Sequence, residues 1–342
     1  MQNMQTLALE QPGRFVFRKP ADPRKPEAGE VLVRAARVGI CGTDLHAFEG
    51  KQPFFNYPRI LGHELAVEVA ETGSGVTNVK LGDRCAVRPY LACGDCLPCR
   101  RNKPNCCMNI RVLGVHIDGG MQEWLTLPCD YLHASAKLSL EELALVEPLS
   151  IGAHGVWRSG IGHGESALVI GAGPIGLAVV AGIRAAGATA IVLELSAKRR
   201  AFCSQHAGVE TVIEASGDPT EQITAAFGGD LPTYVFDCTG SPRSMTAAFR
   251  YITHGGKLIF VGLYPGEITF NDPDFHKRET TLLSSRNATK EDFVRVMQSL
   301  EAGLILTAPW IEHTFTPETL IESFPKLLDP EAGVLKPMVT WG

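Results

Sequence analysis

A glycine-rich turn in the middle of the chain constrains the fold more than any other feature. The run Gly171-Ala172-Gly173-Pro174-Ile175-Gly176 follows an apolar stretch at 167–170 and opens a helical pattern that extends to residue 186. Glycines here permit a tight strand-to-helix turn, and the helix N-terminus then offers free N–H groups to a phosphate. Pro174 has no N–H and suits the first helical position, so the phosphate-facing amide is assigned to Ile175. The motif predicts a dinucleotide-binding βαβ unit.

An acidic residue at the end of the next expected strand, 190–193, indicates which cofactor binds. Glu194 stands where an acid accepts hydrogen bonds from the 2′ and 3′ hydroxyls of the adenosine ribose and repels a 2′-phosphate. NAD is therefore favoured over NADP. Lys198, Arg199 and Arg200 follow and could hold a 2′-phosphate, but the solvated first turn of a capped helix is the better interpretation for at least two of them. Arg199 is kept as a candidate cofactor contact.

The two halves of the 342-residue chain follow different patterns, which predicts two domains. Short alternating runs of apolar and polar residues between positions 29 and 87 are typical of a β-rich domain. From about residue 151 strands alternate with helices, and further strands are expected at 234–238 and 257–261 with a helix at 244–252 between them. Because strands separated by helices form parallel sheets, the fold class is α/β with a doubly wound parallel sheet in the second half.

Three side chains of the first half could hold one zinc ion. Cys41, His63 and Glu64 supply a thiolate, an imidazole and a carboxylate. Three protein ligands of mixed type leave one coordination position open, and an open zinc can polarise a substrate oxygen. The trio therefore indicates a catalytic zinc, and a purely structural role for the three together is the weaker interpretation.

Four cysteines in one short segment predict a second, structural zinc. Cys93, Cys96, Cys99 and Cys107 follow a Cys-x2-Cys-x2-Cys-x7-Cys spacing, which is typical of a closed four-thiolate site. Cys106 stands beside Cys107 and could substitute for it. Reduced surface thiols or a disulfide pair are the alternative, which the tight repeat in a chain without a secretory signal disfavours.

The overall composition excludes several classes of function. A formal net charge of −5 with interspersed signs gives no basic face for a phosphate backbone, so nucleic acid is not expected as a partner. Residues 1–13 lack a cationic-then-apolar signal pattern and the cysteines fit a reducing compartment, so we expect a cytoplasmic protein. The most apolar stretch, 168–193, is interrupted by glycines and an arginine and is interpreted as strand–helix–strand, not as a membrane span.

Together these motifs resemble the zinc-dependent medium-chain dehydrogenase/reductase family, which contains alcohol, sorbitol and threonine dehydrogenases. The resemblance implies a GroES-like, β-rich catalytic domain at 1–150 and 290–342, a Rossmann domain at 151–289 between its parts, and an active site in the cleft between the domains. Family precedent also implies a homodimer or homotetramer. The resemblance is carried by Cys41-Gly42-Thr43-Asp44-Leu45-His46, Gly62-His63-Glu64, the four cysteines, Glu147-Pro148-Leu149-Ser150, the glycine turn and Val235-Phe236-Asp237-Cys238-Thr239-Gly240.

The resemblance also assigns roles to residues around the zinc trio. It implies that zinc lowers the pKa of a substrate hydroxyl and that hydride passes to the nicotinamide of NAD. Thr43 resembles the family's hydroxyl that hydrogen-bonds the alcohol, and His46 resembles the relay that passes the proton to water. Asp44 resembles the carboxylate that orients His63. Two alternatives stay open: Thr43 could simply cap a helix, and His46 could be an exposed loop histidine without a catalytic role.

Glu147 is the least settled metal ligand. In polyol dehydrogenases of this family a glutamate in the corresponding Glu-Pro stands near or on the catalytic metal. Cys41 and Glu64 as anions already neutralise Zn²⁺, so a permanently bound Glu147 would leave the site negative and weaken its Lewis acidity. We therefore expect Glu147 to be an exchangeable fourth ligand.

Several shorter segments bear on the substrate. Tyr57-Pro58-Arg59, Asn105-Cys106-Cys107 and Phe275-His276-Lys277 resemble bacterial sugar-acid dehydrogenases that act on L-galactonate. The leading hypothesis is NAD-linked oxidation of a secondary hydroxyl on a sugar acid or polyol to a ketone. Alternatives are a sorbitol, threonine or other alcohol dehydrogenase, a zinc-free reductase on the same fold, and a non-catalytic nucleotide or sugar sensor. Candidate substrate-pocket residues, with packing as the alternative for the two phenylalanines, are Phe54, Phe55, Asn56, His116 and Asp118.

Overall fold

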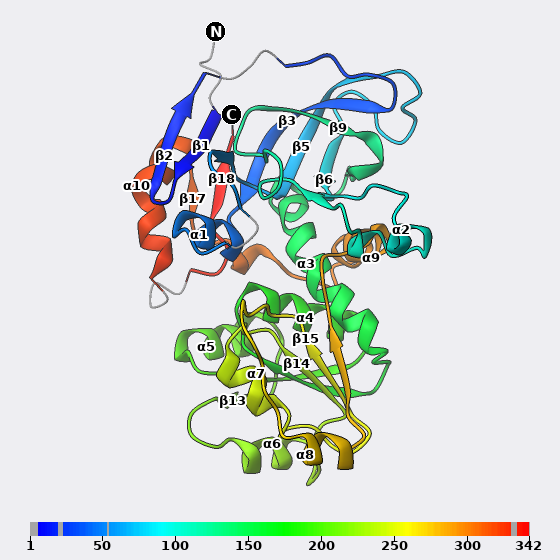
Figure 1. Ribbon diagram of the computed structural model, residues 1–342, viewed down its shortest axis with the longest axis vertical. Helices are drawn as coiled ribbons and strands as arrows, with labels where there is room; N and C mark the ends of the chain where they lie inside the picture. Colours follow the sequence, from blue (N-terminus) through cyan, green and yellow to red (C-terminus); the bar gives the residue numbers. More distant parts are fainter. Residues whose placement is uncertain (1–5, 20–22, 53–54, 330–333, 342) are drawn as a thin grey trace. The chain divides into compact units, whose positions relative to one another are not determined.

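The computed structural model describes residues 6–19, 23–52, 55–329 and 334–341. Its chain divides into two compact units (Figure 1). Unit 1 comprises Met1–Glu147, Thr289–Glu301 and Thr307–Gly342. Unit 2 comprises Pro148–Ala288 and Ala302–Leu306. Segments from both ends of the sequence therefore build unit 1.

Strands form the framework of unit 1. Their bounds are β1 (Thr6–Gln11), β2 (Arg14–Arg18), β3 (Glu30–Gly39), β4 (Arg59–Ile60), β5 (Glu64–Thr72), β6 (Arg84–Val87), β7 (Tyr90–Leu91), β8 (Arg111–Val112), β9 (Trp124–Pro128), β10 (Leu132–Ala134), β17 (Thr314–Phe315) and β18 (Met338–Thr340). The main sheet has the order β10-β6-β5-β3-β18-β17, with β9 also paired to β3. Smaller sheets are β2-β1-β4 and β7-β8. The long β3 and β5 pair antiparallel, and the β-rich character that the alternating pattern of this half predicts is present.

Short helices connect and cover these strands. Their bounds are α1 (Gly42–Phe48), α2 (Leu97–Arg100), α9 (Lys290–Glu301), α10 (Pro317–Ser323) and the 3-10 turns η1 (Pro104–Cys106), η2 (Cys129–Tyr131), η3 (Ala308–Trp310) and η4 (Phe324–Leu328). Three rings anchor α1 in the core: Phe48 lies 5.5 Å from Phe15 and 4.9 Å from Phe324, centroid to centroid. Because these rings come from β2, α1 and η4, the core joins the N-terminal and C-terminal parts of unit 1.

Unit 2 contains a six-stranded parallel sheet. Its elements are β11 (Ser166–Ile170), α4 (Pro174–Ala185), β12 (Thr189–Glu194), α5 (Ala197–His206), β13 (Val212–Glu214), α6 (Thr220–Ala226), β14 (Tyr234–Asp237), α7 (Pro242–Ala248), β15 (Lys257–Phe260), α8 (Asp272–Lys277) and β16 (Thr281–Ser284); α3 (Leu140–Ser159) begins in unit 1 and ends here. The strand order β13-β12-β11-β14-β15-β16 is that of a doubly wound dinucleotide-binding sheet. The predicted α/β fold class is confirmed.

The helix that was predicted at 244–252 begins two residues earlier and ends at Ala248. Ser241 is its N-cap residue and accepts a hydrogen bond from the backbone N–H of Ser244, and Pro242 occupies the first helical position. Ser241 and Pro242 are ordinary helix start signals, and they explain why the helix begins before the predicted residue 244. Within the described ranges of the chain, the structure contains no helix that is both long and apolar enough to cross a membrane.

Glycine-to-alanine substitution in the turn of unit 2 tests its close backbone packing. A Cβ at Gly176 would lie 1.8 Å from the carbonyl oxygen of Gly171, so α4 would have to move away from β11. We predict that Gly176→Ala lowers the free energy of unfolding by about 1–3 kcal/mol, measured by denaturant titration without cofactor. In the control, Gly162→Ala, the new Cβ meets its nearest atom at 3.5 Å. That variant should stay within about 0.5 kcal/mol of the parent, and equal losses would contradict the packing argument.

Candidate metal centre and dinucleotide site

The first predicted metal ligand lies at the start of a helix. Cys41 is the N-cap residue of α1, and its backbone N–H donates to Oδ2 of Asp44 at 2.9 Å. Thr43 and His46 are three positions apart on α1, which places them on one side of the helix. Thr43 is half-buried and His46 is exposed. Thr43 is thus inside the helix and does not cap it, and His46 belongs to a helix and not to a loop.

The other two predicted ligands come from the start of the central strand β5. Glu64 lies opposite Gly39 of β3 in the antiparallel register, and His63 immediately precedes it. A Cβ at Gly39 would lie only 2.2 Å from Oε2 of Glu64. Glycine at that position of β3 therefore leaves the space that the carboxylate occupies.

The side chains of Cys41, His63 and Glu64 converge. One donor atom from each lies within 4.8 Å of the other two, and both His63 and Glu64 are buried. Nδ1 of His63 lies 3.8 Å from Oδ1 of buried Asp44, and neither atom has a hydrogen-bond partner among the described residues. Sulfur, nitrogen and oxygen donors of this kind suit zinc, and a carboxylate behind the imidazole is the usual arrangement for a metal-bound histidine. The orphaned polar atoms and the donor set therefore fit a metal ion.

The charges of this group are strongly coupled. Burial disfavours the imidazolium, yet the Asp44 carboxylate and the Cys41 thiol raise the pKa of His63 well above its ordinary value. Burial also raises the pKa of Asp44, against the opposing effect of His63. Both shifts indicate an excess of buried acidic groups that favours binding of a cation.

Lys336, which the sequence reasoning missed, supplies one positive charge to the centre. Its Nζ donates to Oε1 and Oε2 of Glu64 at 2.6 and 2.8 Å, and the lysine is 2% exposed. Burial lowers the pKa of Lys336, but Glu64, Cys41 and Glu147 together outweigh burial, so the net shift of the pKa is upward. A single lysine inside the apolar run Val334–Val339 is the signal that could have predicted a buried partner. The charge count that argued against Glu147 as a permanent ligand left Lys336 out and is incomplete.

Glu147 contacts Tyr90, the second residue that the sequence reasoning missed. Within the described part of the chain Glu147 does not join the three-donor group, and its Oε1 accepts a hydrogen bond from the Tyr90 hydroxyl. Burial and the nearby Glu64 raise the pKa of Glu147 to about 7. Burial and Glu147 raise the pKa of Tyr90 well above its ordinary value, so the hydroxyl keeps its proton and can donate it in a hydrogen bond.

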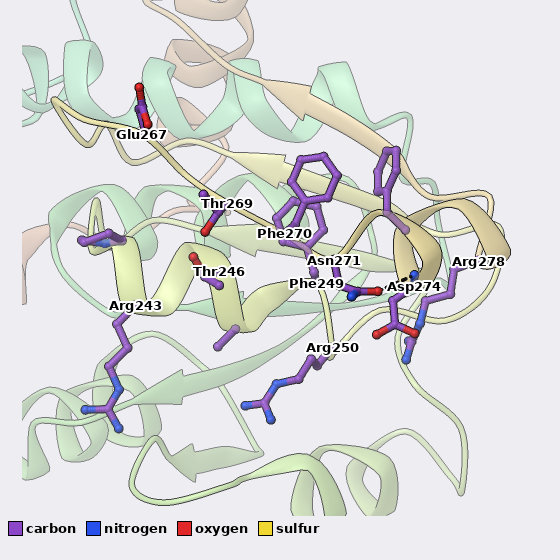
Figure 2. A pocket seen from close by; sticks show the side chains of 13 residues that line it. Arg243, Thr246, Phe249, Arg250, Glu267, Thr269, Phe270, Asn271, Asp274 and Arg278 are labelled. Atoms are coloured by element: carbon purple, nitrogen blue, oxygen red, sulfur yellow. Dashed lines mark hydrogen bonds between the residues drawn. The ribbon is translucent and has the colours of Figure 1, made fainter.

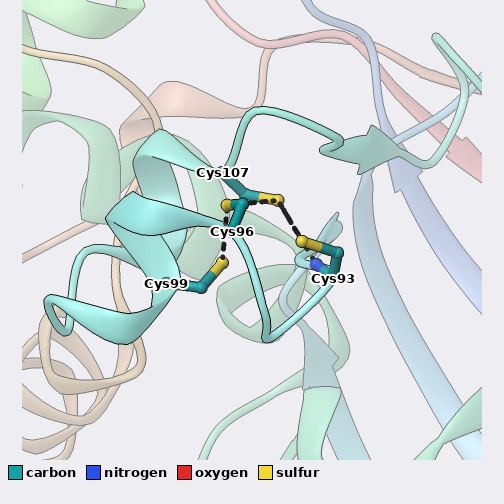
Figure 3. Close-up of side chains that lie close together, drawn as sticks. All are labelled: Cys93, Cys96, Cys99 and Cys107. Carbon is teal, nitrogen blue, oxygen red and sulfur yellow. Dashed lines mark hydrogen bonds between the residues drawn. The ribbon is translucent and has the colours of Figure 1, made fainter.

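The four predicted cysteines of the second site lie together (Figure 3). Sγ separations are 3.4 Å for Cys96–Cys99, 3.4 Å for Cys93–Cys107 and 3.8 Å for Cys96–Cys107. These exceed the ~2.05 Å of a disulfide. They are close to the ~3.8 Å that separates thiolates held at ~2.3 Å from a tetrahedral zinc. Backbone N–H groups of residues 99 and 108 lower the pKa of Cys96 to about 6, which favours its thiolate. Among the described residues, exposed Cys106 is not part of this group.

The glycine turn of unit 2 has an open phosphate-binding geometry. Gly173 is the N-cap residue of α4 and Pro174 takes the first helical position, as predicted. A Cβ at Gly173 would meet only Nη1 of Arg199, at 3.7 Å, so the turn leaves space for a ligand. Glu194 accepts hydrogen bonds from the backbone N–H groups of residues 172 and 196, at 2.6 and 2.8 Å, one at each carboxylate oxygen. Each oxygen retains a second acceptor site for a ribose hydroxyl.

The basic residues after Glu194 differ in their surroundings. They begin helix α5, whose N-cap Ser196 accepts from the backbone N–H of Arg199, so the capped first turn is confirmed. Arg200 forms an ion pair with Glu214 at 3.2 Å. Arg199, by contrast, places its guanidinium next to Gly173. Of the three basic residues, Arg199 is the one that the structure places at the glycine turn.

The candidate substrate-pocket residues are mostly engaged in packing and local hydrogen bonds. Phe54 lies outside the described residues. Phe55 packs on the core with its ring 4.8 Å from that of Tyr57, which favours the packing interpretation. Nδ1 of His116 accepts from the backbone N–H of residue 112 at 3.1 Å, and Asp118 pairs with Arg59 at 3.1 Å. Asn56 is exposed.

A cavity of about 630 Å³ in unit 2 does not belong to either site. It lies beside α7 and α8, and its arginines do not converge: Arg243 and Arg250 extend away from the phenylalanine rings (Figure 2). Arg250 lies 3.7 Å from Asp218, and Asp274 lies 3.2 Å from Lys277. These ion pairs engage Arg250 and Asp274, two of the charged residues that line the cavity.

Comparisons with known proteins agree with this geometry. The family Alcohol dehydrogenase GroES-like domain matches residues 27–137, and the family Zinc-binding dehydrogenase matches residues 174–302. The chain is 39% identical to L-galactonate-5-dehydrogenase of Escherichia coli K12 over 341 residues, which covers 100% of both proteins. Its structure is similar to that of an Escherichia coli CFT073 alcohol dehydrogenase complexed with NADH (TM-score 0.91, 28% identity, 99% of each chain). It is also similar to a Sinorhizobium meliloti 1021 protein bound to NADP (TM-score 0.90, 28% identity, 100% of each chain).

Removing Lys336 tests the buried ion pair. Lys336→Met leaves the Glu64 carboxylate buried without its cation, so we predict a loss of about 3 kcal/mol in unfolding free energy by denaturant titration. The double variant Lys336→Met/Glu64→Gln should recover most of that loss. The matched control is Lys51→Met, because Lys51 pairs with Glu49 at 2.6 Å but is 66% exposed. Loss of this surface ion pair in Lys51→Met should lower the free energy of unfolding by at most about 1 kcal/mol. Equal losses in the two lysine variants would contradict the argument that burial makes the Lys336–Glu64 pair important.

Proposed function

Because the chain belongs to the zinc-dependent medium-chain dehydrogenase/reductase family, we propose that it oxidises a secondary hydroxyl of a sugar acid or polyol to a ketone, with NAD as the hydride acceptor. The observation that carries the proposal is the group of half-buried Cys41 with buried His63 and Glu64, in which three mixed donors leave room for a fourth. The relative named for L-galactonate supports a hydroxyl-rich carboxylate as substrate. The homodimer or homotetramer and the cytoplasmic location that we expect from the sequence analysis are also part of this proposal.

Two zinc ions would be held by residues of unit 1. Cys41, His63 and Glu64 would bind the catalytic ion, with Glu147 beside it, and the four cysteines would bind the structural ion. When bound, the catalytic ion supplies Lewis acidity toward the substrate hydroxyl. Within the chain, Asp44, whose Oδ1 lies 3.8 Å from Nδ1 of His63, would orient the imidazole, and Lys336 holds the Glu64 carboxylate.

Residues of α1 would carry the hydroxyl proton away from the centre. Thr43 is half-buried and follows Cys41 by two positions, and His46 is exposed one turn further along the same side of the helix. This order leads from the buried donors toward solvent. An exposed imidazole at this end of the path would pass the proton on to water.

The turn of unit 2 would hold the cofactor. The backbone N–H of Ile175 and the guanidinium of Arg199 would face the pyrophosphate, next to the space above Gly173. Gly171 and Gly176 allow the tight turn, and Glu194 would accept the ribose hydroxyls. A negative carboxylate at that position disfavours the 2′-phosphate of NADP, and this is the argument for NAD.

Metal analysis of cysteine variants tests both zinc sites. We expect about two zinc ions per chain in the parent and about one in each of Cys41→Ser and Cys99→Ser, because each variant loses one ligand of one site. Cys106→Ser is the matched control and should keep both, since Cys106 is outside the four-cysteine group. Loss of zinc in Cys106→Ser, or two zinc ions in Cys41→Ser, would refute the assignment.

Absorbance at the NADH band tests the reaction and the cofactor. We expect NADH to appear with hexonates or hexitols, and kcat/KM to be higher with NAD than with NADP. Glu194→Gln should reduce the ratio of kcat/KM with NAD to kcat/KM with NADP, because it removes the charge that repels the 2′-phosphate. The amide still has one oxygen that can accept a hydrogen bond from the backbone of the turn. A parent that prefers NADP would refute the role of Glu194, and no turnover of hexonates, hexitols, aldoses or threonine by the zinc-loaded protein would refute the proposed reaction.

A further inference from the structure

Tyr90 lies between the two zinc-binding regions of unit 1. Its strand β7 pairs antiparallel with β8, where Tyr90 is opposite Val112. The four-cysteine segment occupies the chain between these two strands, and Cys93 follows Tyr90 by three residues. The backbone of Tyr90 is therefore fixed at the base of the segment that the four thiols close.

The side chain of Tyr90 is equally constrained. It is 3% exposed, and its ring meets the ring of Phe293 edge to face, with centroids 6.5 Å apart and an interplanar angle of 80°. The hydroxyl donates to Oε1 of Glu147. Packing thus sets the direction of the ring, and a single acceptor occupies the hydroxyl.

Glu147 lies among several charged groups. It is 5% exposed and interacts electrostatically with His63, Glu64 and Lys336. Since a buried carboxylate needs a hydrogen-bond donor or a cation, the Tyr90 hydroxyl and an ion held by the three-donor group would compete for the Glu147 carboxylate. In the structure the carboxylate is bonded to Tyr90 and stands outside the group.

We propose that Tyr90 is a positioning residue whose hydroxyl holds the Glu147 carboxylate beside the metal centre and off the metal, so that the fourth coordination position stays available to an exchangeable ligand. The proposal rests on the proposed function, because it requires a metal on Cys41, His63 and Glu64. It explains how Glu147 stays close to the metal without being a permanent ligand. Without the Tyr90 hydroxyl, the Glu147 carboxylate would lose its hydrogen-bond donor and would bind the metal instead.

The test is ligand exchange at the metal in Tyr90→Phe, with zinc in the four-cysteine site and Co(II) in the three-donor site. Imidazole is titrated and its binding is followed in the visible Co(II) absorption bands. Loss of a hydrogen bond to a charged group lets Glu147 compete for the open position, so imidazole should bind about ten- to a hundredfold more weakly than in the parent. In a Glu147→Gln background the same substitution should change the affinity by at most about twofold.

Tyr234→Phe is the matched control, because Tyr234 hydrogen-bonds a carboxylate, that of Glu165, in unit 2. It should leave the imidazole affinity unchanged. Unchanged affinity in Tyr90→Phe, or an equal loss with and without the Glu147 carboxylate, would overturn the proposal. A parent protein that takes up no Co(II) at Cys41 would instead refute the proposed function, and the parent spectrum separates the two failures.

Glu147→Gln alone tests the same point without altering Tyr90. If Tyr90 holds the carboxylate off the metal, removing its charge leaves the imidazole affinity of the parent unchanged. Markedly tighter imidazole binding in Glu147→Gln would show that Glu147 already occupies the metal, and the proposal would be wrong.

Discussion

Acidic side chains are concentrated in unit 1 where water does not reach, and positive charge must offset them. Glu64 and Asp44 are 0% and 1% exposed, and Glu147 is 5% exposed. An unpaired buried charge costs several kcal/mol, so this arrangement is stable only with cations among the carboxylates. Lys336 supplies one, and the metal that we propose for Cys41, His63 and Glu64 would supply the rest. Because Lys336 lies two residues before the strand β18, which pairs with β3, the centre is complete only when both ends of the sequence fold into one sheet.

Local sequence patterns predicted the centre of unit 2 better than they predicted unit 1. A βαβ unit is built from neighbouring segments, so the apolar runs and the glycine turn predicted β11, α4, β12, β14 and β15 to within a few residues, whereas β13, α6, α8 and β16 were not predicted. The pairing of β18 with β3 joins Thr340 to Arg37. Alternation can predict that each of these strands exists, but it cannot identify the partner across 300 residues of chain. Only the resemblance to a known family indicated that the two ends meet.

Sequence reasoning predicted some residues of the candidate site and missed others for a similar reason. Ligand types and spacings predicted Cys41, His63, Glu64 and the four-cysteine group, because metal chemistry restricts which side chains can serve. Lys336 and Tyr90 carry no such motif. Lysine and tyrosine are common at surfaces, and their importance here follows from burial against Glu64 and Glu147, which depends on the assembled sheet. The charge argument about Glu147 was incomplete for this reason: it counted the predicted ligands and omitted the cation beside them.

The two predicted metal sites are connected through the short β7–β8 pairing. A four-thiolate site is closed, so it performs no chemistry of its own and can act only through the segments that it fixes. Those segments begin with Tyr90 on β7 and end at β8, and the Tyr90 hydroxyl donates from this base to Glu147. Asn105, Cys107 and Ile110 of the loop between the strands are also buried, so packing supports the loop together with the thiols. If zinc occupies the four-cysteine site, as we propose, it would fix this loop and, through β7, the position from which the Tyr90 hydroxyl donates to Glu147.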